Sequence, residues 1–111
     1  MKIEEVFARR RFIMLDGAMG TQLQLRGLTT EQKPDLPAFI MPDVLTAVHR
    51  DYARAGADIL LANTFGANPR KLKGTGYTVQ QVIEASIACA RTAAQETGAL
   101  VALDIGPIGE L

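Results

Sequence analysis

Small and polar residues follow three short apolar runs in this sequence, and together they could bind a small charged ligand. The runs are "FIML", "ILLA" and "LVAL", and the residues after them are Asp16, Gly17 and Ala18, then Asn63 and Thr64, then Asp104, Gly106 and Pro107. An aspartate at a strand end can bind an ammonium group, orient a base or hold a metal, while glycine and alanine leave backbone N–H groups accessible to a carboxylate or phosphate. Capping of the following turn is an equal alternative for Asp16 alone. Three coincident endings favour one shared pocket.

Strands must present these residues, and the apolar runs are too short to be helices. Buried strands are therefore predicted over residues 12–15, 57–63 and 99–104. Two of the runs are followed directly by an aspartate and one by an asparagine. If the strands are parallel, their carboxyl ends meet on one side of the sheet, which is the side that carries the site in such folds.

Apolar residues spaced three and four apart predict the helices between these strands. One is expected over residues 2–10, one from Pro42 to the glycine at position 56, and one from Thr78 to about Thr97. Thr78 with Gln81 matches a capping box, and Pro42 suits the first turn of a helix. Residues 27–42 include three prolines, which predicts an irregular loop.

The alternation of strands and helices predicts an α/β architecture with parallel pairing through right-handed crossovers. Three strands with two intervening helices cannot close a barrel, and they leave apolar faces uncovered. We therefore expect residues 1–111 to be the first part of a larger domain, truncated after its third strand.

Composition narrows the classes of partner and compartment. The chain has 111 residues, and its 12 basic residues balance 12 acidic ones, which argues against a nucleic acid or an anionic membrane as partner. Cys89 is the single cysteine, so the chain forms no disulfide framework and no cysteine metal cluster of its own. The charged N-terminus lacks the apolar core of a signal peptide. A cytoplasmic protein without a membrane anchor is expected.

Four other features are given ordinary structural interpretations. "GAMGT" and "KLKGTG" could cradle a phosphate, but neither matches an established glycine-loop pattern, and a solvated turn is favoured for the second. His49 has no second histidine or cysteine at ligand spacing, so a partly exposed structural histidine is expected. Cys89, among alanines, is expected to be a small buried residue.

Three segments, in their order and at their separations, resemble the homocysteine S-methyltransferase family. They are "MLDGAMGTQL", "VHRDYARAGADILLANTFGAN" and "ALDIGPIGEL". Within that family the similarity is to the homocysteine-binding domain at the N-terminus of cobalamin-dependent methionine synthases, and it extends from about Phe12 to Leu111. The resemblance implies the first three β/α units of a (β/α)8 TIM barrel.

The resemblance also implies an activity, cofactors and partners. Zinc held by three cysteine thiolates would bind the homocysteine sulfur, and the thiolate would attack a methyl group presented as methylcobalamin by a corrinoid-binding domain or protein. S-methylmethionine and betaine serve as donors to other relatives, and "DIGPIGEL" favours the cobalamin branch. The zinc cysteines come from later strands, and Cys89 matches none of them. We therefore expect this chain alone to bind no catalytic zinc and to transfer no methyl group.

By the same resemblance, the predicted residues take roles in binding homocysteine. Asp16 corresponds to the acid that contacts the substrate amino group, and Gly17 and Ala18 to the backbone amides that meet its carboxylate. The second and third strand ends would line the pocket. Two positions depart from the family pattern, because Ala62 replaces a frequent threonine and Ala38 lies near the place of a common asparagine.

Two other classes of function remain open at this point. The chain could be a non-catalytic assembly module whose exposed sheet edge pairs with a complementary chain and completes a barrel. It could also be an unrelated α/β phosphate or nucleotide binder that uses "DGAMGT" or "KLKGTG". The missing phosphate-loop patterns disfavour the last of these.

Overall fold

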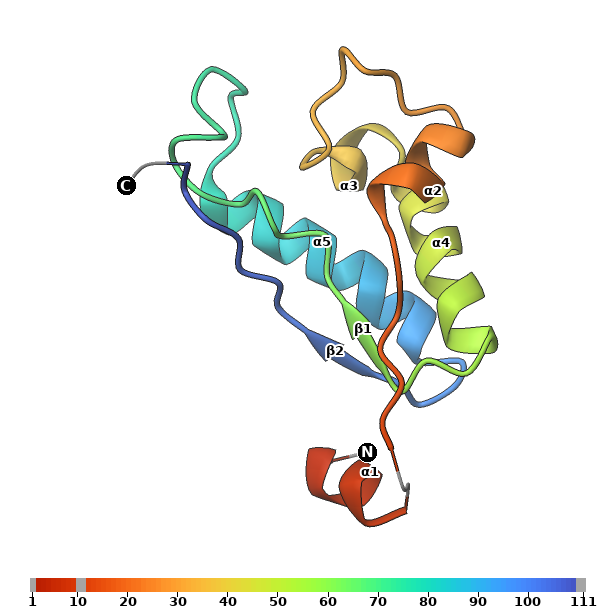
Figure 1. Ribbon diagram of the computed structural model, residues 1–111. Coiled ribbons are helices and arrows are strands. Elements are labelled where there is room, and N and C mark those ends of the chain that lie inside the picture. Colours follow the sequence, from red (N-terminus) through yellow and green to blue (C-terminus); the bar gives the residue numbers. More distant parts are fainter. Residues whose placement is uncertain (1, 10–11, 110–111) are drawn as a thin grey trace.

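A computed structural model describes residues 2–9 and 12–109 of the chain. Helices and strands follow one another in an α/β order, with a small parallel sheet beside two long helices (Figure 1). The elements are α1 (Ile3–Arg9), α2 (Gly20–Leu25), α3 (Pro37–Ile40), α4 (Pro42–Arg54), β1 (Ile59–Leu61), α5 (Val79–Ala94) and β2 (Leu100–Ala102). The α/β class predicted from the sequence is confirmed at this level.

The sheet consists of β1 and β2, which pair in parallel with Ile59 opposite Leu100 and Leu61 opposite Ala102. The crossover between them contains α5, as the alternating pattern predicted. The predicted strand over residues 12–15 is wrong as a strand, because it makes only a single parallel bridge, between Leu15 and Ile59. The first predicted strand is thus an extended segment beside β1 rather than a third regular strand.

Two aspartate side chains explain why this segment lies beside β1 without forming a regular ladder. The Asp58 carboxylate accepts a hydrogen bond from the Met14 N–H at 2.9 Å, and the Asp58 N–H donates to the Met14 carbonyl at 2.7 Å. Two residues on, the Asp16 N–H donates to the Ile59 carbonyl at 3.2 Å, while the Asp16 carboxylate accepts from the Leu61 N–H at 3.0 Å. Carboxylates thus replace backbone carbonyls as acceptors.

The strands are less buried than the sequence predicts. Leu60 is buried, but β2 is only half-buried along its length. Phe12, Met14 and Leu15, predicted to be buried on both faces, are exposed, and Phe12 has 65% of its surface accessible. Each edge of this open sheet lacks a neighbouring strand among the described residues, which leaves these side chains without a packing partner.

The two long helices occur where the sequence places them. Pro42 occupies the first turn of α4, and glycines with positive φ follow both helices, Gly56 at +111° and Gly98 at +78°. The capping box at the start of α5 is confirmed: the Gln81 N–H donates to the Thr78 hydroxyl at 3.1 Å, and the Thr78 N–H donates to the Gln81 side chain at 2.9 Å. Local signals are sufficient for these two elements.

The short helices show where the local signals fail. α2 was not predicted, and α3 lies within residues 27–42, which were expected to be entirely irregular. α1 was predicted as an amphipathic helix, but only Val6 is buried, while Ile3 and Phe7 remain exposed. α1 lies beyond the amino ends of the strands, away from the loops that follow them (Figure 1).

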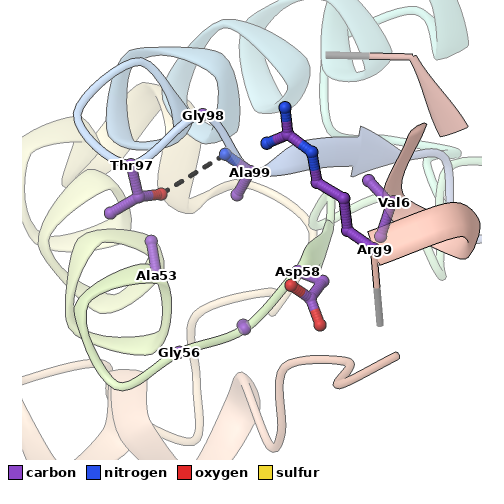
Figure 2. Close-up of a pocket in the computed structure, with 9 residues that line it drawn as sticks. Val6, Arg9, Ala53, Gly56, Asp58, Thr97, Gly98 and Ala99 are labelled. Atoms are coloured by element: carbon purple, nitrogen blue, oxygen red, sulfur yellow. Dashed lines mark hydrogen bonds between the residues drawn. The ribbon is translucent and has the colours of Figure 1, made fainter. Parts of the chain in front are cut away.

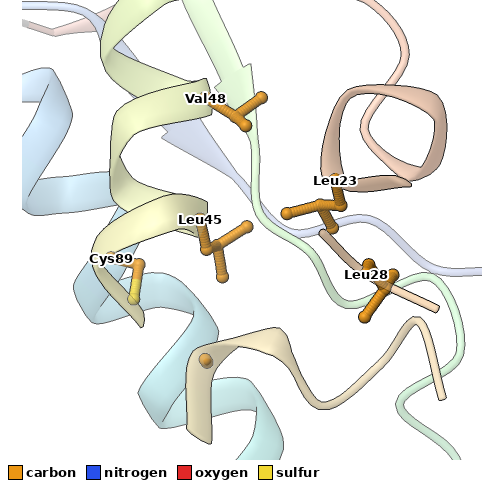
Figure 3. Close-up of a cluster of buried hydrophobic side chains, with 6 residues drawn as sticks. Leu23, Leu28, Leu45, Val48 and Cys89 are labelled. Atoms are coloured by element: carbon orange, nitrogen blue, oxygen red, sulfur yellow. The ribbon is translucent and has the colours of Figure 1, made fainter. Parts of the chain in front are cut away.

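Packing of α2, α3, α4 and α5 creates the main core. Its buried members are Leu23, Leu28, Ala38, Leu45, Val48 and Cys89, with Cys89 beside α4 (Figure 3). The Cys89 thiol lies 3.8 Å from the Pro42 carbonyl, and its predicted buried position is confirmed. A smaller cluster joins Leu60 of β1 to alanines of α4 and α5. No helix in the described part of the chain has the length and apolar character needed to cross a membrane.

Candidate functional site

A pocket of about 260 Å³ lies where the extended segment and β1 end. It is lined by Asp16, Gly17, Met19, Gly20, Pro34, Asp35, Leu61, Ala62, Asn63, Phe65 and Asp104. Four of the residues predicted from the sequence line it, namely Asp16, Gly17, Asn63 and Asp104. The carboxyl ends of the chain segments therefore do bring the predicted polar groups together, as parallel geometry requires.

Asp16 is the pocket carboxylate with an incompletely hydrogen-bonded side chain. One carboxylate oxygen, Oδ2, accepts the Leu61 N–H at 3.0 Å, whereas the other, Oδ1, is buried and has no hydrogen-bond partner among the described residues. Burial raises the pKa of Asp16 above its usual 3.8, and the nearby negative charge of Asp104 raises it further, while hydrogen bonds from the backbone oppose both effects. An unpaired buried acceptor of this kind is stabilised by a donor that carries positive charge.

The loop after Asp16 presents backbone amides. Gly17 and Ala18 are exposed, and among the described residues neither N–H donates a hydrogen bond within the chain. The Ala18 carbonyl accepts from the Tyr52 hydroxyl at 2.6 Å, so this carbonyl is turned toward α4. The amides are available to an anionic group such as a carboxylate.

The end of β1 is tied to two other segments. The Asn63 side-chain amide donates to the Pro34 carbonyl at 2.8 Å, which fixes the loop after α2 against the sheet. Thr64 is buried, and its hydroxyl is hydrogen-bonded to the backbone of Asp104. Asn63 therefore lines the pocket, while the Thr64 side chain holds the Asp104 backbone next to it.

Four residues predicted for the same site lie outside the lining of this pocket, namely Ala18, Thr64, Gly106 and Pro107. Gly106 borders a neighbouring, more apolar cavity of about 250 Å³ that also contacts Thr64 and Asp104. Its α-carbon packs so closely on the Phe65 carbonyl that an added β-carbon would overlap it. Pro107 is exposed and lines neither of these cavities. The third segment thus contributes Asp104 directly and Gly106 through packing.

Sequence reasoning missed Asp35, which lines the pocket from the proline-containing loop. Its carboxylate packs directly over Gly66, where a β-carbon would collide with it. The available signal was an acid after a proline in a loop, since loops carry function more often than the elements they join.

The pocket is acidic. Asp16, Asp35 and Asp104 line it, and the described residues contribute no lysine or arginine to its lining. Three carboxylates in a small concave site favour a ligand with a positive charge, because they attract cations and repel free anions. The Gly17 amide in the lining, followed in the chain by the Ala18 amide, adds a place for a single anionic group. The arrangement suits a zwitterion.

The described residues do not fit the zinc ion that the family resemblance implies. They contain no group of three or more histidine, cysteine, aspartate or glutamate side chains placed to hold a metal. Cys89 is buried in the main core, far in the chain from the pocket residues. A structural zinc site needs about four ligands and a catalytic one about three. We therefore assign no metal-dependent chemistry to these residues.

Most backbone amides of the "KLKGTG" segment donate hydrogen bonds within the chain. Its amides are used internally: Lys71 N–H donates to the Asn68 side chain at 2.9 Å, and Thr75 N–H donates to the Leu72 carbonyl at 3.1 Å. The Lys71 ammonium lies 5.2 Å from the centroid of the Phe65 ring. The N–H groups of residues 71, 72, 73 and 75 thus donate within the chain, which leaves fewer backbone donors for a phosphate.

Another cavity, of about 170 Å³, lies at the opposite end of the strands (Figure 2). Val6 and Arg9 of α1 cover it, and the turns before β1 and β2 form its floor, where the Ala99 N–H donates to the Thr97 hydroxyl at 3.3 Å. None of the predicted site residues lies there. Parallel α/β folds carry their sites at the other end, so we assign the function to the acidic pocket.

Fold and pocket together define an α/β protein with an acidic pocket at the carboxyl ends of parallel segments, the place where small-molecule sites lie in such folds. Comparison with known proteins identifies the family. The sequence model of the family described as "Homocysteine S-methyltransferase" matches residues 13–111, and the chain belongs to this family.

Individual relatives agree with this assignment. Methionine synthase of Mycobacterium tuberculosis is 37% identical over 97 residues, which are 80% of this chain and 8% of that protein. Homocysteine S-methyltransferase of Escherichia coli is 30% identical over 114 residues, which are 91% of this chain and 37% of that protein. The chain therefore spans less than half the length of these relatives.

Solved structures show the same similarity in three dimensions. The metallated form of the homocysteine methyltransferase MmuM from Escherichia coli matches with a TM-score of 0.83 and 29% sequence identity. The match covers 96% of this chain and 42% of that one. The α/β arrangement described here thus resembles part of the structure of that homocysteine methyltransferase.

Proposed function

We propose that this chain forms the homocysteine-binding part of a homocysteine S-methyltransferase, built as the first three units of a (β/α)8 barrel. Membership of the family supports the substrate. The observation that carries the proposal is the Asp16 carboxylate, which has one oxygen bound to the Leu61 N–H and the other buried without a partner in the acidic pocket. The ammonium group of an amino acid would complete it.

The zwitterionic end of homocysteine accounts for the remaining groups. Its ammonium would lie against Asp16, and its carboxylate would meet the free amides of Gly17 and Ala18. Asn63 and Asp104 would line the pocket around it. On this proposal the residues described here bind and orient the substrate, while the thiol extends toward groups outside this chain.

On this proposal, zinc and cobalamin would be bound by groups other than the residues described here. When bound, the zinc of this family would hold homocysteine as a thiolate, with its cysteine ligands in a part of the barrel that lies outside these 111 residues. Methylcobalamin on a corrinoid-binding domain or protein would donate the methyl group, yielding methionine. The similarity to methionine synthase supports this donor. Betaine and S-methylmethionine are the other donors to consider, and betaine–homocysteine S-methyltransferase 1 of Danio rerio is 38% identical over 65 residues.

A second candidate is an assembly module that completes a barrel with a complementary chain. It is favoured by large exposed apolar side chains at both edges of the sheet, Phe12, Met14 and Leu15 on one and Leu103, Ile105 and Ile108 after the other. Unpaired strand edges of this kind recruit further strands. The two candidates are compatible, since a completed barrel would also complete the catalytic centre.

Ligand binding to the 111-residue chain tests the proposed function. Calorimetric titrations would compare homocysteine with homocysteamine, which lacks the carboxylate, and with mercaptobutyrate, which lacks the amino group. We expect homocysteine to bind best and mercaptobutyrate worst, because the pocket is acidic. Equal heats for all three compounds, or a preference for mercaptobutyrate, would contradict the proposal.

A further inference from the structure

Tyr52 connects the long helix α4 to the loop that forms one wall of the pocket. Its hydroxyl donates a hydrogen bond to the Ala18 carbonyl at 2.6 Å, across 34 positions of sequence. Tyr52 itself is absent from the pocket lining, so it reaches the loop from behind. Any effect of Tyr52 on a ligand must therefore pass through the backbone of this loop.

The ring of Tyr52 also restrains the neighbouring residue. A β-carbon built on Gly17 would lie 3.1 Å from both Cε1 and the hydroxyl oxygen of Tyr52, so the glycine backbone packs directly on the ring. The ring is itself held firmly, because it packs against both apolar clusters of the protein. The loop therefore rests on a rigid support rather than on a mobile side chain.

The hydrogen bond from Tyr52 to the Ala18 carbonyl also sets the direction of the next backbone N–H, because the peptide bond is planar. In a trans peptide the carbonyl of one residue and the N–H of the next point in opposite directions. Because the Ala18 carbonyl is turned toward Tyr52, the Met19 N–H points away from α4. Gly17 and Met19 both line the pocket, and in the described chain neither N–H donates an internal hydrogen bond.

We propose that Tyr52 is a positioning residue that holds the loop amides of residues 17–19 in place for the carboxylate of an amino-acid substrate. The proposal rests on the proposed function and extends it to specificity. Asp16 recognises the amino group, while Tyr52, acting through the loop, sets the preference for ligands that carry a carboxylate. Preorganised donors of this kind bind an anion without the cost of ordering the loop on binding.

The substitution Tyr52→Phe tests this division of roles, because it removes the hydroxyl and keeps the ring over Gly17. Homocysteine binding should weaken about three- to tenfold, the effect of losing one hydrogen bond. Binding of homocysteamine, which has no carboxylate, should change less than twofold. Tyr77→Phe is the matched control, since Tyr77 stacks on Phe39 at 4.0 Å, remote from this loop in the sequence.

Equal weakening of homocysteine and homocysteamine in Tyr52→Phe would overturn the proposal, because a merely structural role would affect both ligands alike. An unchanged affinity for homocysteine would overturn it too. Comparison of thermal unfolding midpoints for the two tyrosine variants shows whether either has lost its fold.

A measurement without ligand keeps this proposal separate from the proposed function. In Tyr52→Phe the ¹H–¹⁵N heteronuclear NOE of Gly17, Ala18 and Met19 should fall, since the loop loses its anchor, while Tyr77→Phe leaves it unchanged. If the chain binds no homocysteine but the NOE falls, the proposed function fails and the positioning role of Tyr52 is retained. If the NOE stays unchanged, Tyr52 does not position the loop.

Discussion

The hydroxyl of Thr64 makes two hydrogen bonds with the backbone of Asp104. It donates to the Asp104 carbonyl at 2.8 Å and accepts from the Asp104 N–H at 3.0 Å. The last backbone bond between these segments runs from the Ala62 N–H to the Ala102 carbonyl, so the threonine side chain continues the pairing beyond the strands. This link holds Asp104 at the pocket, where its charge contributes to the raised pKa of Asp16.

Replacing Thr64 by valine should destabilise the fold and disturb the pocket. The change keeps the side-chain shape but leaves the Asp104 N–H and carbonyl without their partner, which costs about 1 to 3 kcal/mol of unfolding free energy. Urea titration would measure it. Thr92→Val is the control, because Thr92 is exposed on α5 and should tolerate the change within about 0.5 kcal/mol. Equal effects of the two substitutions would contradict the assigned role of Thr64.

His49 should make stability depend on pH. It is completely buried rather than partly exposed as expected, both ring nitrogens lack partners, and burial lowers its pKa from 6.5 to about 4. Between these values the unfolded chain binds more protons, so stability falls as the pH drops. We expect a loss of about 2 kcal/mol between pH 7 and pH 5, measured by urea titration at each pH.

The variant His49→Leu provides the control for that titration. Leucine is similar in size and cannot titrate, so the variant should lose much less stability over the same pH range. Asp16 acts in the opposite direction at lower pH, since its raised pKa favours the folded state on acidification, but it is common to both proteins. Parallel pH profiles for wild type and variant would rule out His49 as the cause.

The substitution Asp16→Asn should weaken homocysteine binding by about 1.5 to 3 kcal/mol, the size of a hydrogen bond to a charged group. The amide oxygen of asparagine can still accept the Leu61 N–H, so the fold should be spared. Calorimetry would measure the affinity, with mercaptobutyrate as the control ligand that has no ammonium group to lose. An unchanged affinity for homocysteine would remove Asp16 from the site.

The purified chain should bind no stoichiometric zinc and should not methylate homocysteine. Its described residues lack a group of metal ligands, and its single cysteine is buried in the core. Elemental analysis after dialysis would give the zinc content, and methionine production would report methyl transfer from each candidate donor. One tightly bound zinc per chain with sulfur ligands, seen by X-ray absorption, would contradict this expectation.

The isolated chain should self-associate through its apolar sheet edges. Ile105 is 82% exposed after β2, and its replacement by lysine should shift the chain toward monomer in sedimentation velocity experiments. Leu25→Lys is a matched control, because Leu25 is 76% exposed on α2, away from the sheet edges. A wild-type chain that remains monomeric at high concentration would argue against association through the sheet edges.

Prediction from sequence succeeded where the determining contacts are local. The start of α5 follows from Thr78 and Gln81, three residues apart, and the start of α4 follows from Pro42. It failed for the segment over residues 12–15, where two aspartates replace part of the ladder, and for α3, where prolines suggested only a loop. These outcomes depend on partners far away in the chain.

By itself the sequence determined the α/β order, the two long helices, the family and the polar residues at the segment ends, because periodicity, caps and motifs are short-range properties. Only the tertiary structure decided which of those residues share a pocket. It added Asp35, assigned Thr64 to support rather than lining, and left one Asp16 oxygen unpaired. Such outcomes arise from packing between residues tens of positions apart, as in the contact of Tyr52 with Ala18, and short-range signals carry no record of them.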